Sequence, residues 1–325
     1  MVATRSGHTT TLLKNGKVLV AGGQGTTTAS PTSELYDPIT GAWTATTDML
    51  RGRVGAKATL LANGKVLVVS GDCFYDLPPS EGPVPLFGSA ELYDPDTGSW
   101  TDAGGVFDGC SEHTVTLLAD GRVLVAGGSA SEPDGSSAAA HLYNPVTGAW
   151  DATGNMISDH HGHTATLLND GTVLVAGGGS GSGPYDSVEL YDPAAGTWSA
   201  TNHLAAARAN HYAVLLSDGR VLIGGGDTMT NPPPTELYDP LTKSWTSARP
   251  MANARTGYTA TLLLDGRVLV VGASGELYDP ASDSWSNTAP MIEESPFSST
   301  ATLLNDGTVL VVDGGSAFAQ VFDPS

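Results

Sequence analysis

Short apolar segments alternate with turn residues along the whole chain, and one such pattern recurs seven times. Each copy joins an apolar segment to a second one, similar to Val-Leu-Val, through an Asn-Gly or Asp-Gly pair, as in TLLKNGKVLVAGG (residues 11–23). The pairs begin at Asn15, Asn63, Asp120, Asp170, Asp218, Asp265 and Asp306. Both central residues of a two-residue type I′ turn need positive φ, which Asn and Asp tolerate and Gly adopts freely. The pattern therefore predicts seven β-hairpins with type I′ turns.

A second element follows each hairpin and predicts two more strands. Its aromatic position is occupied by Tyr36, Tyr93, Tyr143, Tyr191, Tyr238, Tyr278 and Phe322. In the first six copies a tryptophan stands seven residues later, at Trp43, Trp100, Trp150, Trp198, Trp245 and Trp285. The intervening Asp-Pro and Gly residues are typical of a tight turn, and a tryptophan at a fixed repeat position is a large apolar side chain for packing one sheet on the next. Each repeat is thus predicted to be a four-stranded antiparallel sheet.

The Gly-Gly after the second strand, the Tyr-Asp-Pro step and the trailing Trp resemble the kelch repeat over nearly the whole chain. The resemblance implies an all-β, seven-bladed β-propeller of the galactose oxidase/kelch superfamily, similar to bacterial kelch-like domains. We expect one domain over residues 1–325, with blades at about 1–49, 50–106, 107–156, 157–204, 205–251, 252–291 and 292–325. The seventh tryptophan would fall past Ser325, so either the seventh blade lacks its outer strand or the natural chain continues.

Composition narrows the range of partners. The formal net charge of -20 repels phosphate backbones, which argues against nucleic acid and anionic membrane surfaces. No apolar run approaches the roughly 18 residues that span a bilayer, and the start MVATRSGHTT has no signal-peptide core, so we expect a soluble chain without membrane insertion. The Thr, Ser and Gly-rich loops, and the resemblance to extracellular bacterial kelch-like domains, favour a secreted or extracytoplasmic setting.

The sequence also predicts which face of the ring carries function. The first-to-second and third-to-fourth strand connections are short and uniform, and in an antiparallel blade both lie on one face. The second-to-third strand loops and the links between blades share the opposite face, where segment lengths vary. Insertions gather where function is expected, so we place a binding site on this variable face around the central channel.

The segment before each first strand repeats a small polar motif at the channel entrance. One position reads His8, Ala56, His113, His163, His211, Tyr258 and Ser299; three residues upstream it reads Arg5, Arg53, Cys110, His160, Arg208, Arg255 and Pro296. Shared positions more often serve the fold than function. Departures from the repeat are the better clue, and they concentrate in blades two to five, at Lys57, Glu112, Asp159 to His161 and Asn210.

The prediction we favour is a binding module for a small-molecule, glycan or protein ligand. Arginines gathered at one mouth of an acidic chain would form a pocket for anions or carboxylates. The predicted ligand-binding residues are Arg5, Arg53, Arg208, Arg255, Tyr258, Tyr75 and Asn210. A third possibility is a structural spacer domain without a site.

The alternative is a metal-dependent enzyme. His113, His163 and His211 occupy equivalent positions on consecutive blades, and His160 or Glu112 could complete a set for a single zinc or copper ion. Glu112 and His161 would then act as the catalytic acid–base residues of a hydrolase rather than an oxidase. Equivalent positions around a channel can also diverge, which would leave no metal site.

Similarity to the copper-binding blade of galactose oxidases is limited to NHYAVLLSDGRVLIGGG, where His211 falls on the ligand histidine. Asn210 stands where that family has a ligand tyrosine. The chain also has no aligned Cys and Tyr for that family's cross-linked cofactor, and Glu112 and Gly162 are among the residues at that repeat position. The family's separate C-terminal domain, which supplies another ligand, is not expected in this chain. A radical copper oxidase is therefore not predicted. The two cysteines, Cys73 and Cys110, flank adjacent blades on the variable face and are predicted to form a disulfide, with free thiols or a Cys110 metal ligand as the alternatives.

Overall fold

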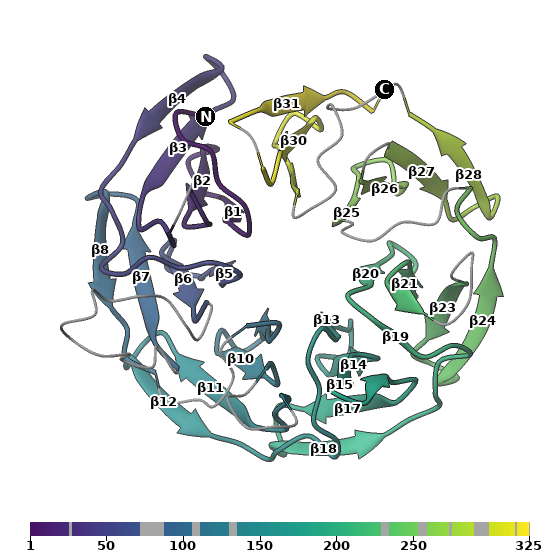
Figure 1. The fold of residues 1–325 in the computed structure, drawn as a ribbon. Coiled ribbons are helices and arrows are strands. Elements are labelled where there is room, and N and C mark those ends of the chain that lie inside the picture. The colour runs from purple at the N-terminus through teal and green to yellow at the C-terminus, as the bar shows by residue number, and fades with distance from the viewer. Residues whose placement is uncertain are drawn as a thin grey trace.

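The computed structural model describes residues 1–25, 28–71, 88–105, 111–129, 135–228, 234–252, 259–272, 275–288, 299–315 and 317–324. Over these residues the secondary structure consists of β-strands, without a helix, arranged as seven antiparallel sheets around a central channel (Figure 1). The predicted all-β, seven-bladed propeller is confirmed. The same residues contain no helix of a length and hydropathy suited to crossing a membrane.

Each blade is numbered in chain order, and its strands run from the channel outward. Blade one holds β1 (Thr9–Leu12), β2 (Val18–Ala21), β3 (Ser33–Asp37) and β4 (Ala42–Ala45), and blade two β5 (Lys57–Leu60), β6 (Val66–Val69), β7 (Ala90–Asp94) and β8 (Ser99–Asp102). Blade three holds β9 (Thr114–Leu117), β10 (Val123–Ala126), β11 (Ala140–Asn144) and β12 (Ala149–Ala152). Blade four holds β13 (Thr164–Leu167), β14 (Val173–Ala176), β17 (Val188–Asp192) and β18 (Thr197–Ala200).

The remaining blades continue the same order. Blade five holds β20 (Tyr212–Leu215), β21 (Val221–Gly224), β23 (Thr235–Asp239) and β24 (Ser244–Ala248), and blade six β25 (Thr259–Leu262), β26 (Val268–Val271), β27 (Gly275–Asp279) and β28 (Ser284–Asn287). Within the described ranges, blade seven has three strands, β29 (Thr300–Leu303), β30 (Val309–Val312) and β31 (Ala319–Phe322). Two short pairs lie outside the blades: β15 (Gly179–Ser180) with β16 (Gly183–Pro184), and β19 (Arg208–Ala209) with β22 (Asp227–Thr228).

The Asn-Gly and Asp-Gly pairs close hairpins as predicted, but the predicted turn type is wrong. In blade one the Gly16 amide donates to the Leu13 carbonyl at 2.9 Å and the Leu13 amide donates to the Lys17 carbonyl at 2.8 Å. Of the pair, Gly16 has positive φ (+83°) and Asn15 does not. This is a type I turn followed by a left-handed glycine, the three-residue hairpin loop, and the Asn15 side chain accepts a hydrogen bond from the Lys17 amide at 3.0 Å.

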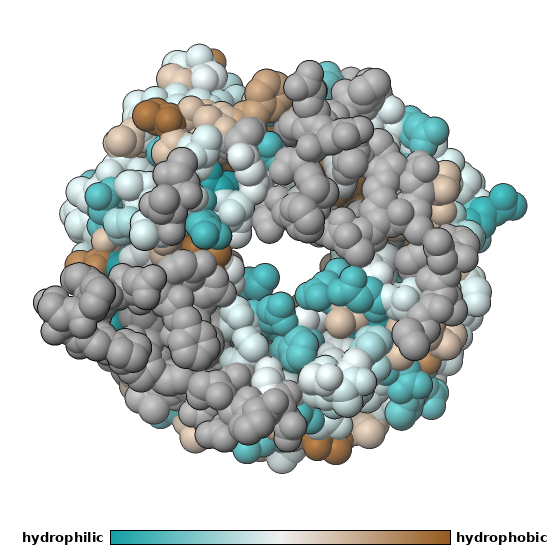
Figure 2. Space-filling model, in the orientation of Figure 1, coloured by the Kyte–Doolittle hydropathy of each residue, from teal (hydrophilic) through white to brown (hydrophobic). Residues whose placement is uncertain are grey.

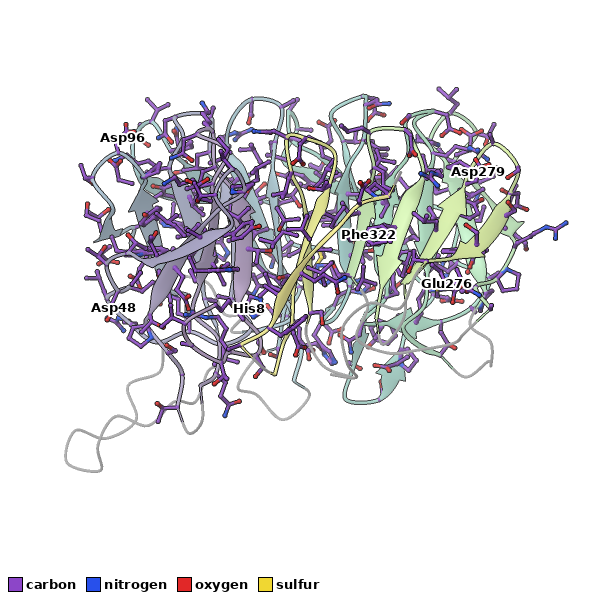
Figure 3. All side chains as sticks on the ribbon, turned by 90° about the horizontal axis from the view of Figure 1, so that it is seen from above. His8, Asp48, Asp96, Glu276, Asp279 and Phe322 are labelled. Carbon is purple, nitrogen blue, oxygen red and sulfur yellow. The ribbon has the colours of Figure 1, made fainter. Side chains whose placement is uncertain are left out.

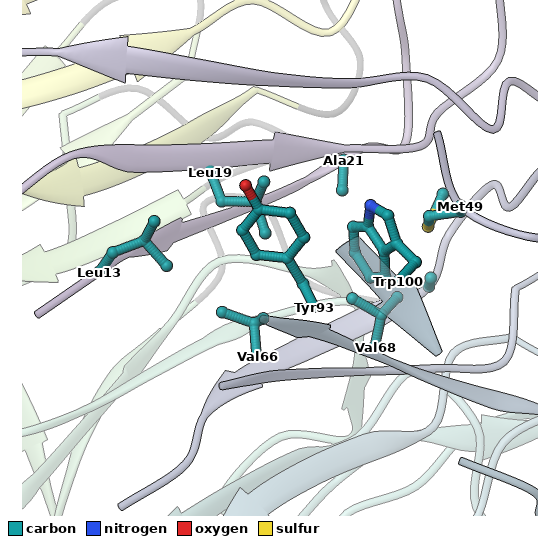
Figure 4. Close-up of a cluster of buried hydrophobic side chains, with 9 residues drawn as sticks. Leu13, Leu19, Ala21, Met49, Val66, Val68, Tyr93 and Trp100 are labelled. Carbon is teal, nitrogen blue, oxygen red and sulfur yellow. The ribbon is translucent and has the colours of Figure 1, made fainter. Parts of the chain in front are cut away.

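The core consists of apolar layers between neighbouring blades. The second strands are buried throughout, and their side chains alternate between the two adjacent layers. Between blades one and two, Leu19 and Ala21 pack against Val66 and Val68, with Trp100 closing the outer side (Figure 4). Each such buried aliphatic side chain stabilises the fold by roughly 1.5–3 kcal/mol.

The tryptophans join the blades, which confirms their predicted structural role. In each of the first six repeats the Tyr of the third strand lies opposite the Trp of the fourth, with ring centroids 4.8–5.0 Å apart. The Trp100 indole also donates to the Thr47 carbonyl of the preceding blade at 3.0 Å. Trp100 therefore contacts the tyrosine of its own blade and the backbone of the preceding one.

The ring has two faces, which we name by their connections. The turn face carries the hairpin turns and the turns between third and fourth strands, and includes Asp96 and Asp279 (Figure 3). The loop face carries the residues that precede each first strand, including His8, and the links between blades, including Asp48 (Figure 3).

Candidate functional site

The predicted ligand-binding arginines that the structure describes are structural. Arg5, Arg53 and Arg208 are 1%, 2% and 0% exposed. Each pairs with a glutamate of the third strand in its own blade: Arg5 with Glu34 at 2.7 Å, Arg53 with Glu91 at 2.9 Å, and Arg208 with Glu236 at 2.8 Å. Their guanidinium groups also donate to backbone carbonyls, as Arg5 does to Gly22 at 2.8 Å. The prediction of an arginine-lined anion pocket is corrected for these three, because their charges are buried and neutralised.

His160 replaces arginine in blade four. It is 0% exposed, and its Nε2 lies 3.3 Å from Glu189, the glutamate equivalent to those paired with arginine elsewhere. The ring of Tyr185 packs edge-on against it, with centroids 5.6 Å apart. His160 therefore completes a buried blade pair rather than offering its imidazole to a metal.

The repeat-consensus histidines connect neighbouring blades. Nε2 of His8, His163 and His211 forms hydrogen bonds with the first-strand threonines of the preceding blades, Thr300 at 3.0 Å, Thr114 at 2.9 Å and Thr164 at 2.9 Å. Burial lowers the pKa of His8 to about 4 and that of His211 to about 3, so both imidazoles are neutral near pH 7. These side chains point around the ring rather than toward its axis.

The predicted metal site of His113, His163, His211 and His160 is therefore not formed. In the part of the chain that the structure describes, no group of three or more His, Cys, Asp or Glu side chains is arranged to hold a metal ion. The physical reason is that two of the three consensus nitrogens are committed to threonines one blade away.

His113 differs from its equivalents because Lys57 replaces the threonine it would face. The chain has Thr9, Thr114, Thr164, Thr259 and Thr300 at the start of five first strands and Tyr212 in a sixth, but Lys57 in blade two. His113 is 1% exposed, and burial, followed by the charge of Lys57, lowers its pKa to about 3. Lys57 itself faces water in the channel, yet the surrounding walls lower its pKa, while the Glu112 carboxylate acts in the opposite direction.

A ring of backbone hydrogen bonds crosses from blade to blade just before the first strands, and we call it the mouth ring (residues 7, 55, 112, 162 and 210). The Gly55 amide donates to the Gly7 carbonyl at 2.8 Å, Gly162 to Glu112 at 3.1 Å, and Asn210 to Gly162 at 2.7 Å. All five residues have positive φ. Glycine suits such a backbone, whereas Glu112, at φ +57°, is strained there and Asn210, at +53°, is tolerated.

The residues that depart from the repeat lie in or beside this ring. We call Lys57, Glu112, His161 and Asn210 the mouth cluster. Glu112 Oε2 lies 3.8 Å from His161 Nε2, with the two side chains 45% and 23% exposed, and the Asn210 amide donates to Asp227 at 3.0 Å. Figure 2 shows a central opening on the loop face, bordered by hydrophilic side chains on the side of blades four and five. The structure thus brings together Glu112 and His161, the two predicted acid–base residues.

The other predicted residues lie outside the described part of the chain. These are Tyr75, Arg255, Tyr258 and both members of the predicted disulfide, Cys73 and Cys110.

Two clefts lie on the opposite, turn face. One of about 550 Å³ is bounded by Asn63, Arg122 and Val146, between blades two and three; the other, of about 290 Å³, is bounded by Lys17, Ile39 and Asn305, between blades seven and one. Both are formed by the same three turns of the repeat, so they reflect the periodicity of the fold and not a specialised blade.

The geometry defines a seven-bladed β-propeller with a polar site at one mouth of its channel. Comparison adds that residues 162–202 match the family model described as the Kelch motif. This matched segment covers most of blade four and the link that follows it. No curated protein matches the chain significantly.

One similar solved structure is described as a novel fungal alcohol oxidase with catalytic diversity among the AA5 family, in complex with copper. The match has a TM-score of 0.78 and 16% identity, and covers 99% of this chain and 74% of that one. At this identity the likeness concerns the fold. The residues here do not fit copper, because Nε2 of His211 is bonded to Thr164 and the side chain of Asn210 to Asp227.

Proposed function

We propose that this propeller binds a small-molecule, glycan or protein ligand on its loop face, through the mouth cluster at the entrance of the channel. The observation that carries the proposal is that the residues which depart from the repeat lie at the channel entrance in adjacent blades. Lys57, Glu112, His161 and Asn210 stand where other blades have mostly threonine, glycine or small residues, and they belong to adjacent blades two to five. Residues that maintain the fold recur in most blades, whereas each of these four occurs at its repeat position in one blade.

The strain at Glu112 supports a role beyond folding. A left-handed conformation costs a residue with a Cβ about 1–2 kcal/mol, and glycine occupies three of the other four positions in the mouth ring. Among the described residues, the ion contact of this carboxylate is with His161, at 3.8 Å, and it offsets little of this cost because both side chains are partly exposed. Backbone strain that persists without local compensation is typical of binding and catalytic sites.

The chemistry of the cluster suits a polar ligand with both hydrogen-bond donors and acceptors. It combines an amine, a carboxylate, an imidazole and an amide at the entrance of the channel. Hydroxyl-rich glycans and the polar parts of peptides match this set. We also propose an extracytoplasmic location, which the Thr, Ser and Gly-rich composition of the loops supports.

The proposal is tested by returning the cluster to the repeat sequence. The triple variant Lys57→Thr, Glu112→Gly, His161→Ser restores residues that other blades carry, so the propeller should still fold. Labelled wild-type protein would be applied to a glycan array and an immobilised peptide library. We expect at least one reproducible ligand, whose affinity falls at least tenfold in the triple variant and is unchanged in Lys65→Thr, a control on the turn face. Equal binding by the triple variant would remove the mouth cluster as the site.

A further inference from the structure

Lys57 differs from the other lysines of the chain in its position on the ring. Lys14, Lys17, Lys65 and Lys243 stand in or beside the strand connections of the turn face. Lys57 instead begins β5, an innermost strand that lies between β1 and β9 at the channel (Figure 1), and its side chain is exposed. A small molecule that enters the channel from the loop face can therefore reach this amine.

The amine of Lys57 forms no ion pair with any residue that the structure describes. On the turn face, by contrast, Lys65 pairs with Asp94 at 3.0 Å. The Glu112 carboxylate acts on Lys57 through its charge, but the ion contact of that carboxylate among the described residues is with His161. The Lys57 amine is thus left for a molecule from outside the chain.

The surroundings of Lys57 favour the uncharged amine. Burial by the channel walls lowers its pKa, and the Glu112 carboxylate offsets this only in part. Two histidines beside it add no negative charge: burial first, and then nearby positive charges that include Lys57, lower the pKa of His113 to about 3 and hold that of His163 well below its usual value. Both imidazoles are neutral near pH 7, so they do not stabilise an ammonium as a carboxylate would. A larger share of Lys57 than of an ordinary lysine is therefore free amine.

We propose that Lys57 is a nucleophile that forms a Schiff base with small hydroxyaldehydes at the channel mouth. This inference rests on the proposed function, because Lys57 belongs to the mouth cluster, and it adds a carbonyl group to the description of the ligand. A lysine amine that is partly removed from bulk water, without a counter-ion, is suited to attack a carbonyl carbon. Glu112, His161 and Asn210 supply the hydrogen-bonding groups for the hydroxyls of such a molecule.

The step needs neither an oxidant nor a reductant. The Lys57 nitrogen attacks the aldehyde carbon, a C–N bond forms, and one proton passes from the nitrogen to the aldehyde oxygen, which gives a carbinolamine. The C–O bond then breaks, the hydroxyl leaves as water with the second nitrogen proton, and a C=N bond remains. Glu112, whose charge acts on the amine, carries these protons between nitrogen and oxygen.

The test traps the Schiff base as a stable secondary amine. The full chain is incubated briefly with glycolaldehyde and sodium cyanoborohydride and then digested, and the labelled fraction of each lysine is measured by mass spectrometry. Near pH 7 we expect Lys57 to be labelled at least about fivefold faster than Lys65 and Lys243, because more of its amine is unprotonated. The labelling rate at Lys57 should also level off at a lower pH than the rate at Lys243. In urea-unfolded protein all the lysines should react at similar rates.

Two variants complete the test. Lys57→Arg keeps the positive charge but forms no Schiff base, so labelling at this position should disappear while Lys243 is labelled as before. Lys65→Arg, on the turn face, is the matched control and should leave the labelling of Lys57 unchanged.

Equal labelling of Lys57 and Lys243 in the folded chain would overturn the inference, and so would a preference for Lys57 that persists after unfolding. Failure of this inference is distinguishable from failure of the proposed function. If the mouth-cluster triple variant loses its array ligand and Lys57 shows no preferential labelling, the binding site stands and the Schiff base does not. If Lys57 is labelled preferentially and the triple variant still binds the array ligand, the amine chemistry stands and that ligand belongs elsewhere.

Discussion

Replacing Glu112 by glycine should stabilise the protein, which is an unusual expectation for the removal of a charged side chain from a folded structure. Glu112 holds φ +57° in the mouth ring, and relief of this strain is worth about 1–2 kcal/mol. The introduced glycine loses more backbone entropy on folding than glutamate does, which costs about 0.5–1 kcal/mol of stability. The partly exposed contact with His161, at 3.8 Å, is worth a few tenths of a kcal/mol at most. The net expectation is a gain of about 0.5–1 kcal/mol.

The assay is equilibrium urea unfolding of wild type and variant, compared through the midpoints at a shared slope, since midpoints are better determined than extrapolated free energies. Gly162→Ala is the reverse control: φ is +62° and a Cβ would lie 2.7 Å from Asn210 Oδ1, so this variant should be destabilised. Asn210→Gly should leave the stability nearly unchanged. Asn tolerates positive φ, so little strain is relieved, and the hydrogen bond from the Asn210 side chain to Asp227 is lost. A loss of stability in Glu112→Gly would refute the reasoning, because the carboxylate would then be held for structural reasons.

Three other expectations follow from the buried polar groups. Arg208→Met should destabilise the protein by about 3–5 kcal/mol in urea unfolding, and adding Glu236→Gln should restore much of this, because the single change leaves a buried carboxylate unpaired; a loss below about 1 kcal/mol would contradict it. The contribution of His211 to the free energy of unfolding should be fully present above pH 6.5 and should fall by about 2 kcal/mol at pH 5. The reason is that the pKa of His211 is about 3 in the folded protein and about 6.5 in the unfolded chain, so the unfolded chain takes up the proton. His211→Gln should reduce the pH dependence of stability by about one proton, and an unchanged slope would count against this expectation. Thr164→Val should cost about 1–2 kcal/mol by removing the partner of His211 Nε2, measured by calorimetry, whereas the exposed Thr44→Val should be neutral.

The fold could be predicted from the sequence because its signals are local and repeated. The glycine of each turn, the third-strand tyrosine and the trailing tryptophan each act within one repeat or on the next, so seven copies in phase define the ring. The turn type was mispredicted because a left-handed glycine alone is enough: Asn15 keeps negative φ and uses its side chain to accept a hydrogen bond from the Lys17 amide.

The site was predicted less well, because the sequence did not show where the histidine side chains point or which residues pair with the arginines. Whether His163 points to the channel axis or around the ring depends on the pleat of the first strand and the angle between blades, which sequence spacing does not specify. The burial of Arg5 depends on its ion pair with Glu34, 29 residues away in the sequence. Because Glu34 lies in the mostly apolar ELYDP segment, the sequence near Arg5 gives no sign of this partner. A signal for this pair was present: glutamate occurs in that segment of the blades that carry Arg5, Arg53, Arg208 and Arg255.

The pairing of arginine with glutamate has a consequence for how the repeats can diverge. Blade three has Cys110 and His141 at the two positions, and blade seven has Pro296 and Gln320, so both blades have lost both charges. Losing one at a time would strand a buried ion at a cost of about 3–5 kcal/mol, a large share of the total stability of an ordinary domain. Blade four has an intermediate arrangement, because His160 replaces the arginine and its Nε2 lies 3.3 Å from Glu189, within hydrogen-bond distance. Replacing arginine by histidine first would therefore let a blade lose the ion pair in two steps. Neither step would leave a buried charge without a partner, which direct loss of the arginine would do.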